Sequence, residues 1–304
     1  MAPLSLANHH PMMFPDRGSP EFAQFEEHTF VNKEVKLHAV AAGPKDGPLA
    51  ILLHGFPEFW YCWRKQIAPL AAAGLRVIVP DQRGYNLSSK PGRVRDYALP
   101  CMTSDVIAIA DHLSREKFSL AGHDWGAAVA WNTAIHFASR VSRLAILNVP
   151  HPSVMRRYFL RPAQLLKSWY MFFFQLPVLP EALFSMGNFR LGIDSLRRTS
   201  RSGTFTSEDL QRYREAWSQP GAVSAMIHWY RALFRHWPQV PSAKLSVPTL
   251  VLWGVEDRFL LPRMADESAQ QCTDVRLVRF EHATHWLPHE EGEQVSQLLA
   301  GFFR

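Results

Sequence analysis

The sequence predicts an α/β fold in which a mostly parallel, eight-stranded sheet is flanked by helices and carries an inserted helical cap. Short, continuously apolar runs alternate with helical patterns, as in parallel sheets whose strands are buried on both faces. The alternation stops over residues 150–243, where several helical patterns and many aromatic residues occur without a convincing strand. A helical insertion between two halves of one sheet is typical of a cap over the carboxyl edge of the strands, where ligands bind.

The expected elements follow in chain order. Residues 1–20 are rich in proline and polar side chains and are interpreted as a loose leader. The eight expected strands are short apolar or alternating runs, at residues 25–31, 34–41, 48–53, 75–80, 118–121, 141–148, 248–253 and 275–280. The expected core helices lie between or after these strands, at residues 60–72, 101–115, 126–138 and 290–303. The core is therefore expected to comprise residues 21–149 and 244–304, and the cap residues 150–243.

Composition argues against disorder and against nucleic-acid binding. Hydrophobic residues make up 47% of the 304 positions and charged residues 20%, which is typical of a globular protein. The formal charge of +6 raises the question of a nucleic-acid partner. However, the basic residues are spread thinly, and their densest cluster, residues 190–201, is interrupted by Ser, Thr and Gly. We expect a mildly basic surface without a nucleic-acid partner.

Cysteine usage and the apolar segments bear on the compartment. Cys62, Cys101 and Cys272 are widely separated and form no zinc motif, so we expect neither a metal nor a cofactor. The first residues lack the basic start and apolar run of a secretory signal. The most apolar stretch, residues 169–179, is too short to span a bilayer and contains a proline. We expect a cytoplasmic protein without a membrane span, either a monomer or a homodimer.

The turn at residues 122–126 gives the first chemical signal. Its sequence, Gly-His-Asp-Trp-Gly, follows an apolar strand and precedes an Ala-rich helix. The pattern G-x-S-x-G in this setting holds a nucleophilic serine on a sharp strand-to-helix turn. An aspartate in a Gly-rich turn is, taken alone, more often a turn former or a helix N-cap. The strand before it and the helix after it favour Asp124 as a nucleophilic carboxylate.

Candidates for the other catalytic groups follow later strands. A nucleophile needs a base and a group that orients the base. Asp257 follows the strand at 248–253, and His285 follows the strand at 275–280, with His282 close by. The expected oxyanion hole consists of two backbone N–H groups, from Trp125 directly after the nucleophile and from Phe56 after the third strand.

Several segments together resemble the epoxide hydrolases of the α/β-hydrolase fold. They are HGFPEFWY (54–61), DQRGYNLS (81–88), GHDWGA (122–127) and the late acid and histidine. The resemblance covers roughly residues 25–304. Within the cap, SWYMFFFQLP (168–177) and AMIHWYRA (225–232) are similar to the family segments that carry two epoxide-activating tyrosines, here Tyr170 and Tyr230.

The resemblance implies roles for these residues. Asp124 would attack an epoxide carbon and form an alkyl ester while Tyr170 and Tyr230 protonate the epoxide oxygen. His285, held by Asp257, would then activate the water that hydrolyses the ester to a vicinal diol. The family histidine precedes an aromatic residue, which favours His285 over His282. The expected substrates are apolar aryl or alkyl epoxides, in a pocket lined by Phe56, Pro57, Trp125, Trp169, Phe174 and Trp286.

Two alternatives stay open. A haloalkane dehalogenase would use the same aspartate nucleophile and base, but halide needs N–H donors such as a second tryptophan or an asparagine. Phe56 stands where many dehalogenases carry asparagine, and the two cap tyrosines favour an epoxide. A non-catalytic binding module is the alternative from another class, although the whole set of catalytic candidates is present. Turnover of an aryl epoxide, with Asp124→Ala as control, separates these possibilities.

Overall fold

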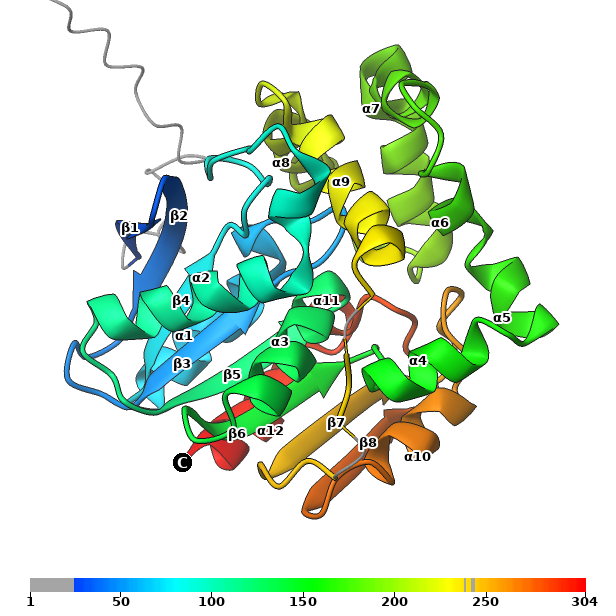
Figure 1. Cartoon of the computed structure of the whole chain (residues 1–304). Helices are drawn as coiled ribbons and strands as arrows, with labels where there is room; N and C mark the ends of the chain where they lie inside the picture. The colour runs from blue at the N-terminus through cyan, green and yellow to red at the C-terminus, as the bar shows by residue number, and fades with distance from the viewer. Residues whose placement is uncertain (1–24, 238, 242–243) are drawn as a thin grey trace, which may run out of the picture.

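The computed structural model describes residues 25–237, 239–241 and 244–304 (Figure 1). Its centre is an eight-stranded sheet with the order β1-β2-β4-β3-β5-β6-β7-β8. β1 pairs antiparallel with β2, and β2 pairs antiparallel with β4, whereas every later pair of neighbours is parallel. The predicted fold class is confirmed. The leader predicted for residues 1–20 lies outside the described residues.

All eight predicted strands are present, with ends shifted by at most two residues. Every residue of β3, β4, β5 and β7 is buried, which is why these strands could be recognised as continuous apolar runs. The strands are β1 (Glu26–Asn32), β2 (Val35–Ala42), β3 (Leu49–Leu53), β4 (Arg76–Pro80), β5 (Phe118–His123), β6 (Val141–Leu147), β7 (Thr249–Gly254) and β8 (Val275–Phe280).

The core helices agree with prediction where they are long and differ where they are short. The helix expected over 60–72 divides into a 3-10 turn and α1. The short elements η2, α10 and α11 were not predicted, because segments of four to seven residues are too short to show a helical period. The elements are η1 (Trp60–Trp63), α1 (Arg64–Ala72), η2 (Val94–Tyr97), α2 (Leu99–His112), α3 (Trp125–His136), α10 (Arg263–Ala269), α11 (Leu287–Glu290) and α12 (Gly292–Phe303).

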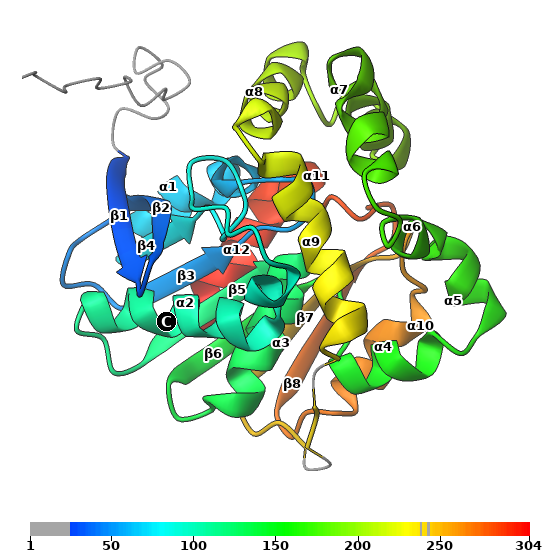
Figure 2. The ribbon, with the colours of Figure 1, turned by 45° about the horizontal axis from the view of Figure 1, so that its top comes forward.

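Among the described residues, six helices form the insertion between β6 and β7. In Figures 1 and 2, α5, α6 and α7 lie along one side of the molecule, and α8 and α9 cross over the sheet. α7 contains a break, because residues 186–189 have non-helical backbone angles. The division of the chain into domains at residues 150 and 243 stays a prediction. The helices are α4 (Pro152–Tyr158), α5 (Pro162–Lys167), α6 (Trp169–Phe173), α7 (Leu179–Thr199), α8 (Ser207–Ser218) and α9 (Ala222–Arg235).

The parallel strands bring their carboxyl ends to one edge of the sheet. The loops that follow β3, β5, β6 and β7 therefore lie close together beneath the cap. Within the described part of the chain, no helix has both the length and the apolar character that a membrane span requires. All three cysteines are described, and each is free.

Candidate active site

Asp124 stands at the tip of a tight turn between β5 and α3. Its backbone has φ 50° and ψ −125°, a conformation that costs a non-glycine residue of order 1–3 kcal/mol and occurs mostly at functional sites. Glycines on both sides make the turn possible: a Cβ on Gly122 would collide with the Gly126 carbonyl, and a Cβ on Gly126 with the Leu53 carbonyl. The turn therefore presents the carboxylate above the sheet edge.

The carboxylate of Asp124 is already bound by one of the predicted oxyanion donors. The backbone N–H of Phe56 donates to Asp124 Oδ1 at 2.7 Å. A Cβ on Gly55 would overlap the Asp124 side chain, so glycine is required for this approach. The N–H of Trp125 is the first of α3 and has no intrahelical acceptor, and the helix N-terminus favours a negative charge beside it.

His285 connects Asp124 with Asp257. Its Nε2 lies 3.4 Å from Asp124 Oδ2, and its Nδ1 lies 2.7 Å from Asp257 Oδ2. The second oxygen of Asp257 accepts from the backbone N–H groups of Phe259 (2.7 Å) and Leu260 (3.0 Å). Burial opposes the charge of Asp257, but His285 and these hydrogen bonds hold the pKa of the carboxyl below its ordinary value.

The protonation of His285 depends on both carboxylates. Burial alone would lower the pKa of this imidazole, but the charge of Asp257 and the hydrogen bonds and charge of Asp124 raise it to about 10. His285 is therefore an imidazolium at neutral pH as long as Asp124 carries its charge. Any reaction that neutralises Asp124 removes one of the two groups that hold this proton.

Two phenols face this charged group from the cap. Tyr170 lies on α6 and Tyr230 on α9, with ring centroids 5.8 Å apart in an edge-to-face arrangement. The ring of Tyr230 also packs on Trp125 at 5.0 Å and on Phe56 at 5.2 Å. Burial raises the pKa of both phenols, and the charge of Asp124 raises it further. Both tyrosines are therefore neutral hydrogen-bond donors at physiological pH.

Two cavities meet at these groups. The larger has a volume of about 920 Å³, and the smaller about 90 Å³. Both are lined by Asp124, Tyr170, Tyr230, Phe259 and His285. Of the pocket residues expected from the sequence, Trp125 lines the smaller cavity, and the other five line the larger one: Phe56, Pro57, Trp169, Phe174 and Trp286. The structure thus brings all the predicted site residues to one place except Asp257, which lies behind His285.

Residues 48–292 match the family model described as the α/β hydrolase fold. The chain is 44% identical over 277 residues to the AB hydrolase superfamily protein YfhM of Bacillus subtilis (strain 168), which covers 90% of this chain and 97% of that protein. It is 39% identical over 278 residues to human Epoxide hydrolase 4, covering 89% of this chain and 76% of that protein. The chain belongs to the epoxide hydrolase family of the α/β-hydrolase fold.

The solved structures agree with this membership of the epoxide hydrolase family. A Bacillus megaterium epoxide hydrolase in complex with an inhibitor superposes with a TM-score of 0.82 and 28% identity, covering 90% of this chain and 99% of that one. An epoxide hydrolase from metagenomes of hot environments superposes with a TM-score of 0.83 and 30% identity, covering 92% and 99%. The resemblance inferred from the sequence is confirmed at the level of family and fold.

Two other cap tyrosines, Tyr158 and Tyr213, and a second histidine, His282, lie outside this site. The side chain of His282 is 89% exposed, and its ring faces Glu256 at 3.9 Å. The hydroxyl of Tyr158 donates to Glu267 at 2.7 Å, away from the cavity. Tyr213 is fully buried, and its hydroxyl donates to Glu58 at 2.8 Å.

Sequence reasoning missed Asn148, which follows β6. Its side-chain N–H donates to Asp257 Oδ2 at 2.7 Å, and its Oδ1 accepts from the backbone N–H of Gly254 at 3.1 Å. Asn148 has φ 54°, a conformation that asparagine tolerates better than most residues. The sequence did show an asparagine at the carboxyl end of a parallel strand. That position predicts a residue that holds Asp257 in place.

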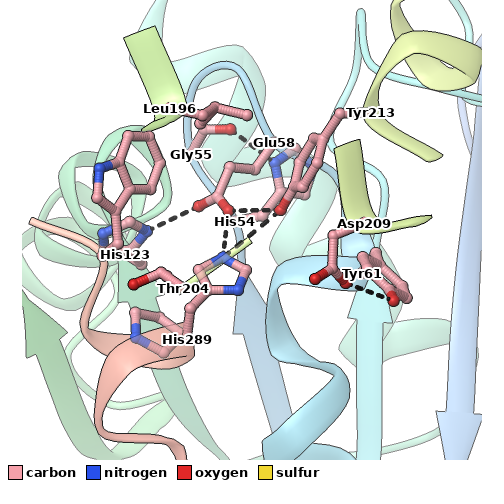
Figure 3. Close-up of polar contacts among 12 residues, drawn as sticks. His54, Gly55, Glu58, Tyr61, His123, Leu196, Thr204, Asp209, Tyr213 and His289 are labelled. Carbon is pink, nitrogen blue, oxygen red and sulfur yellow. Dashed lines mark hydrogen bonds and ion pairs between the residues drawn. The ribbon is translucent and has the colours of Figure 1, made fainter. Parts of the chain in front are cut away.

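Sequence reasoning also missed a buried polar cluster behind the elbow, the Glu58 network, made of Glu58, His123, Tyr213 and His289 (Figure 3). Glu58 Oε1 contacts His289 Nε2 at 2.6 Å, and Glu58 Oε2 contacts His123 Nδ1 at 3.1 Å. His289 Nδ1 lies 2.8 Å from a guanidinium nitrogen of Arg64. Because a guanidinium only donates, His289 is neutral with its proton on Nε2.

The same bonding rule applies to His123, the neighbour of Asp124. Its Nε2 lies 2.8 Å from the backbone carbonyl oxygen of His285, and its Nδ1 faces the Glu58 carboxylate. Burial opposes the charge of Glu58, but the two histidines hold the pKa of its carboxyl well below the usual range. Both partners of His123 are then acceptors. One buried histidine thus joins the base loop, the elbow and Glu58.

Proposed function

We propose that the protein is an epoxide hydrolase that converts apolar epoxides into vicinal diols through an alkyl ester on Asp124. One observation carries this proposal: a carboxylate, a histidine and two neutral phenols line the same apolar cavity. His285 Nε2 lies 3.4 Å from Asp124 Oδ2, and Tyr170 and Tyr230 lie across the cavity on cap helices. Attack on a saturated carbon with protonation of the departing oxygen needs this opposed arrangement.

In the first step Asp124 attacks an epoxide carbon. The new bond joins a carboxylate oxygen to that carbon, and the ring C–O bond breaks with its electron pair on the oxygen. An alkoxide is too basic to form unaided at neutral pH, so a phenol of Tyr170 or Tyr230 transfers its proton to the oxygen. The result is a hydroxyalkyl ester on Asp124, opposite a phenolate.

Ester formation prepares the base for the second step. The ester is neutral, so His285 loses the charge of Asp124 that raised its pKa and retains only Asp257 as a charged partner. The proton that His285 then releases balances the proton that the phenol gave to the epoxide oxygen. The cavity therefore passes from ester formation to hydrolysis without acid or base from solution.

Neutral His285 takes a proton from water, and the resulting hydroxide attacks the carbonyl of the Asp124 ester. The tetrahedral oxyanion accepts hydrogen bonds from the N–H groups of Phe56 and Trp125, each donor being worth on the order of 3 kcal/mol of barrier. Collapse releases the diol oxygen, which takes the proton of the new acid. The product is the diol, with Asp124 again ionised and His285 again an imidazolium.

Isotope labelling tests the covalent step. A single turnover in heavy-oxygen water should place the label in the carboxylate of Asp124, because water attacks the ester carbonyl and not the substrate carbon. Peptide mass spectrometry reads the label. Label found only in the diol would overturn the ester mechanism. Asp124→Ala should form no adduct, and Asp46→Ala, at an exposed site, serves as the matched control.

The dehalogenase alternative is tested with the same protein. A neutral phenol can protonate an epoxide oxygen, whereas a halide leaves as a stable anion and needs no proton. Diol formation from a styrene-like epoxide without halide release from chloroalkanes or bromoalkanes is the expected outcome. Halide release without diol formation would favour the dehalogenase.

A cytoplasmic location, supported by three free cysteines, is part of the same proposal.

A further inference from the structure

The exposed apolar side chains of this protein gather in one region. Among the described residues, twelve large hydrophobic side chains are exposed, and ten of them lie within residues 160–234. Single exposed hydrophobic residues are ordinary, but a contiguous group marks an interaction surface. Nine of the ten lie on or beside α5, α6 and α7 and define what we call the α5–α7 edge: Leu160, Leu166, Trp169, Phe172, Leu176, Val178, Leu179, Met186 and Leu191.

The α5–α7 edge forms one side of the molecule and reaches the mouth of the larger cavity. α5, α6 and α7 lie on the same side in both ribbon views (Figures 1 and 2). Leu166, Trp169 and Leu191 line the cavity and are also exposed to solvent, at 77%, 63% and 50%. The apolar surface is therefore continuous with the entrance to the catalytic groups.

The segment of the chain that contains the edge is also rich in basic residues. The segment 156–201 has eight basic and two acidic residues, a difference of +6, which equals the formal charge of all 304 residues. The remaining 25 basic and 25 acidic residues cancel. Several of the eight have acidic partners, such as Arg157 with Glu267 and Arg201 with Glu291. Within the described residues Arg156, Arg197 and Arg198 are exposed and make no ion pair.

The backbone at Val178 adds an independent observation. This residue has φ 63°, which is a genuine outlier for a β-branched side chain, and the side chain is 74% exposed. Val178 precedes α7, and this conformation leaves its side chain exposed at the α5–α7 edge.

We propose that the α5–α7 edge docks on the surface of an anionic lipid bilayer. Its aromatic and aliphatic side chains would enter the interfacial region, and its unpaired arginines would meet anionic headgroups. A second copy of the chain is a poor occupant, because a two-fold contact would place two strongly basic edges against each other. An apolar surface with unpaired arginines on the same segment matches an anionic membrane in both respects.

Docking would also place the cavity mouth toward the lipid. Apolar epoxides concentrate in the bilayer, so substrate could pass from lipid to cavity without crossing water. This last consequence rests on the proposed function, whereas the docking itself does not. Binding of vesicles can therefore be measured without substrate, and its failure is distinct from a failure of epoxide hydrolysis.

The test is co-sedimentation of the full chain with vesicles. Phosphatidylcholine vesicles containing phosphatidylglycerol should bind the protein, pure phosphatidylcholine vesicles should bind it weakly, and high salt should weaken the binding. A triple variant, Phe172→Gln with Leu176→Gln and Val178→Asn, should lose on the order of tenfold or more in affinity. A charge variant, Arg156→Gln with Arg197→Gln, should lose the preference for anionic lipid.

Controls keep the outcome interpretable. Val31→Gln removes an exposed apolar side chain from β1, far from the edge, and should leave vesicle binding unchanged. Turnover of a water-soluble epoxide reports that each variant is folded. Equal vesicle binding by the wild type and the triple variant, or no binding at all, would overturn the proposal. So would a dimer in sedimentation equilibrium that the triple variant dissociates, since a second copy would then cover the edge.

Discussion

On the sheet side of the cavity the carboxylate of Asp257 accepts four hydrogen bonds, whereas on the cap side the ring of Tyr230 is held by contacts with four aromatic rings. The difference follows from charge. A buried carboxylate is tolerated only when donors surround it, but a neutral phenol can be positioned by shape alone. A single substitution at a charged group on the sheet side should therefore cause a large loss of activity. A single substitution of a phenol on the cap side should cause a smaller loss, which grows when both phenols are replaced.

The sharpest test of the sheet side is Asp257→Asn. The amide keeps the shape but cannot stabilise the imidazolium or fix the same tautomer of His285. Ester hydrolysis should fall by on the order of 10⁴-fold, while ester formation stays measurable. Rapid-quench mass spectrometry should show the ester accumulating. If ester formation and hydrolysis fall together, Asp257 does more than serve the base.

On the cap side, Tyr170→Phe and Tyr230→Phe keep the ring packing and remove only the proton. Each single variant should slow ester formation by about tenfold to a hundredfold, and the double variant by roughly 10³-fold or more. Stopped-flow measurement of the first step separates this from hydrolysis. Tyr158→Phe, at a cap phenol whose hydroxyl donates to Glu267 away from the cavity, is the matched control. Full alkylation rates in the double variant would rule out both donors.

A smaller effect than that of the double tyrosine variant is expected at Asn148, which holds Asp257 and does not line the cavity. Asn148→Ala leaves one oxygen of the buried acid short of a donor, at a cost of about 1–3 kcal/mol. Hydrolysis should slow by roughly tenfold to a hundredfold with ester formation unchanged. Asn148→Asp would place a second carboxylate beside Asp257 and should be worse than alanine. An equal loss in both steps would indicate a general loss of folding.

The pH dependence of stability tests the charged groups on the sheet side of the cavity. The pKa of His285 is raised from an unfolded value of 6.5 to about 10, so the folded state binds its proton more tightly. This contribution to stability is fully present below pH 6.5 and is lost as pH rises toward 10. In Asp124→Ala this contribution should be smaller and its loss should be complete at a lower pH, because one of the two carboxylates that raise the pKa of His285 is gone. Urea unfolding across this range measures the shift, and an unchanged profile would contradict it.

The sequence was sufficient for the groups that follow strands. Asp124, Asp257 and His285 could be predicted because parallel strands deliver their carboxyl ends to one edge. Tyr170 and Tyr230 came only from family resemblance, since a tyrosine in an aromatic cap is otherwise indistinguishable from packing. Their roles stay predictions until the variants above are measured.

The Glu58 network could not be predicted for a different reason. Glu58 and His289 are 231 residues apart in sequence, and each alone is an ordinary polar residue near a loop. Only the three-dimensional fold shows that the two side chains are buried together and bonded to each other. The α5–α7 edge was not predicted either. Exposure, which depends on what the rest of the chain leaves uncovered, is not written in local sequence.

The Glu58 network also joins one cap helix, α8, to the core through charged side chains. From Glu58 the contacts continue through Arg64 to Asp209 on α8, at 3.0 Å, and Tyr213 of the same helix donates to Glu58 itself. Separating α8 from the core would strand buried charges, which costs far more than parting apolar side chains. Any opening that admits epoxide or releases diol should therefore leave α8 in place on the core.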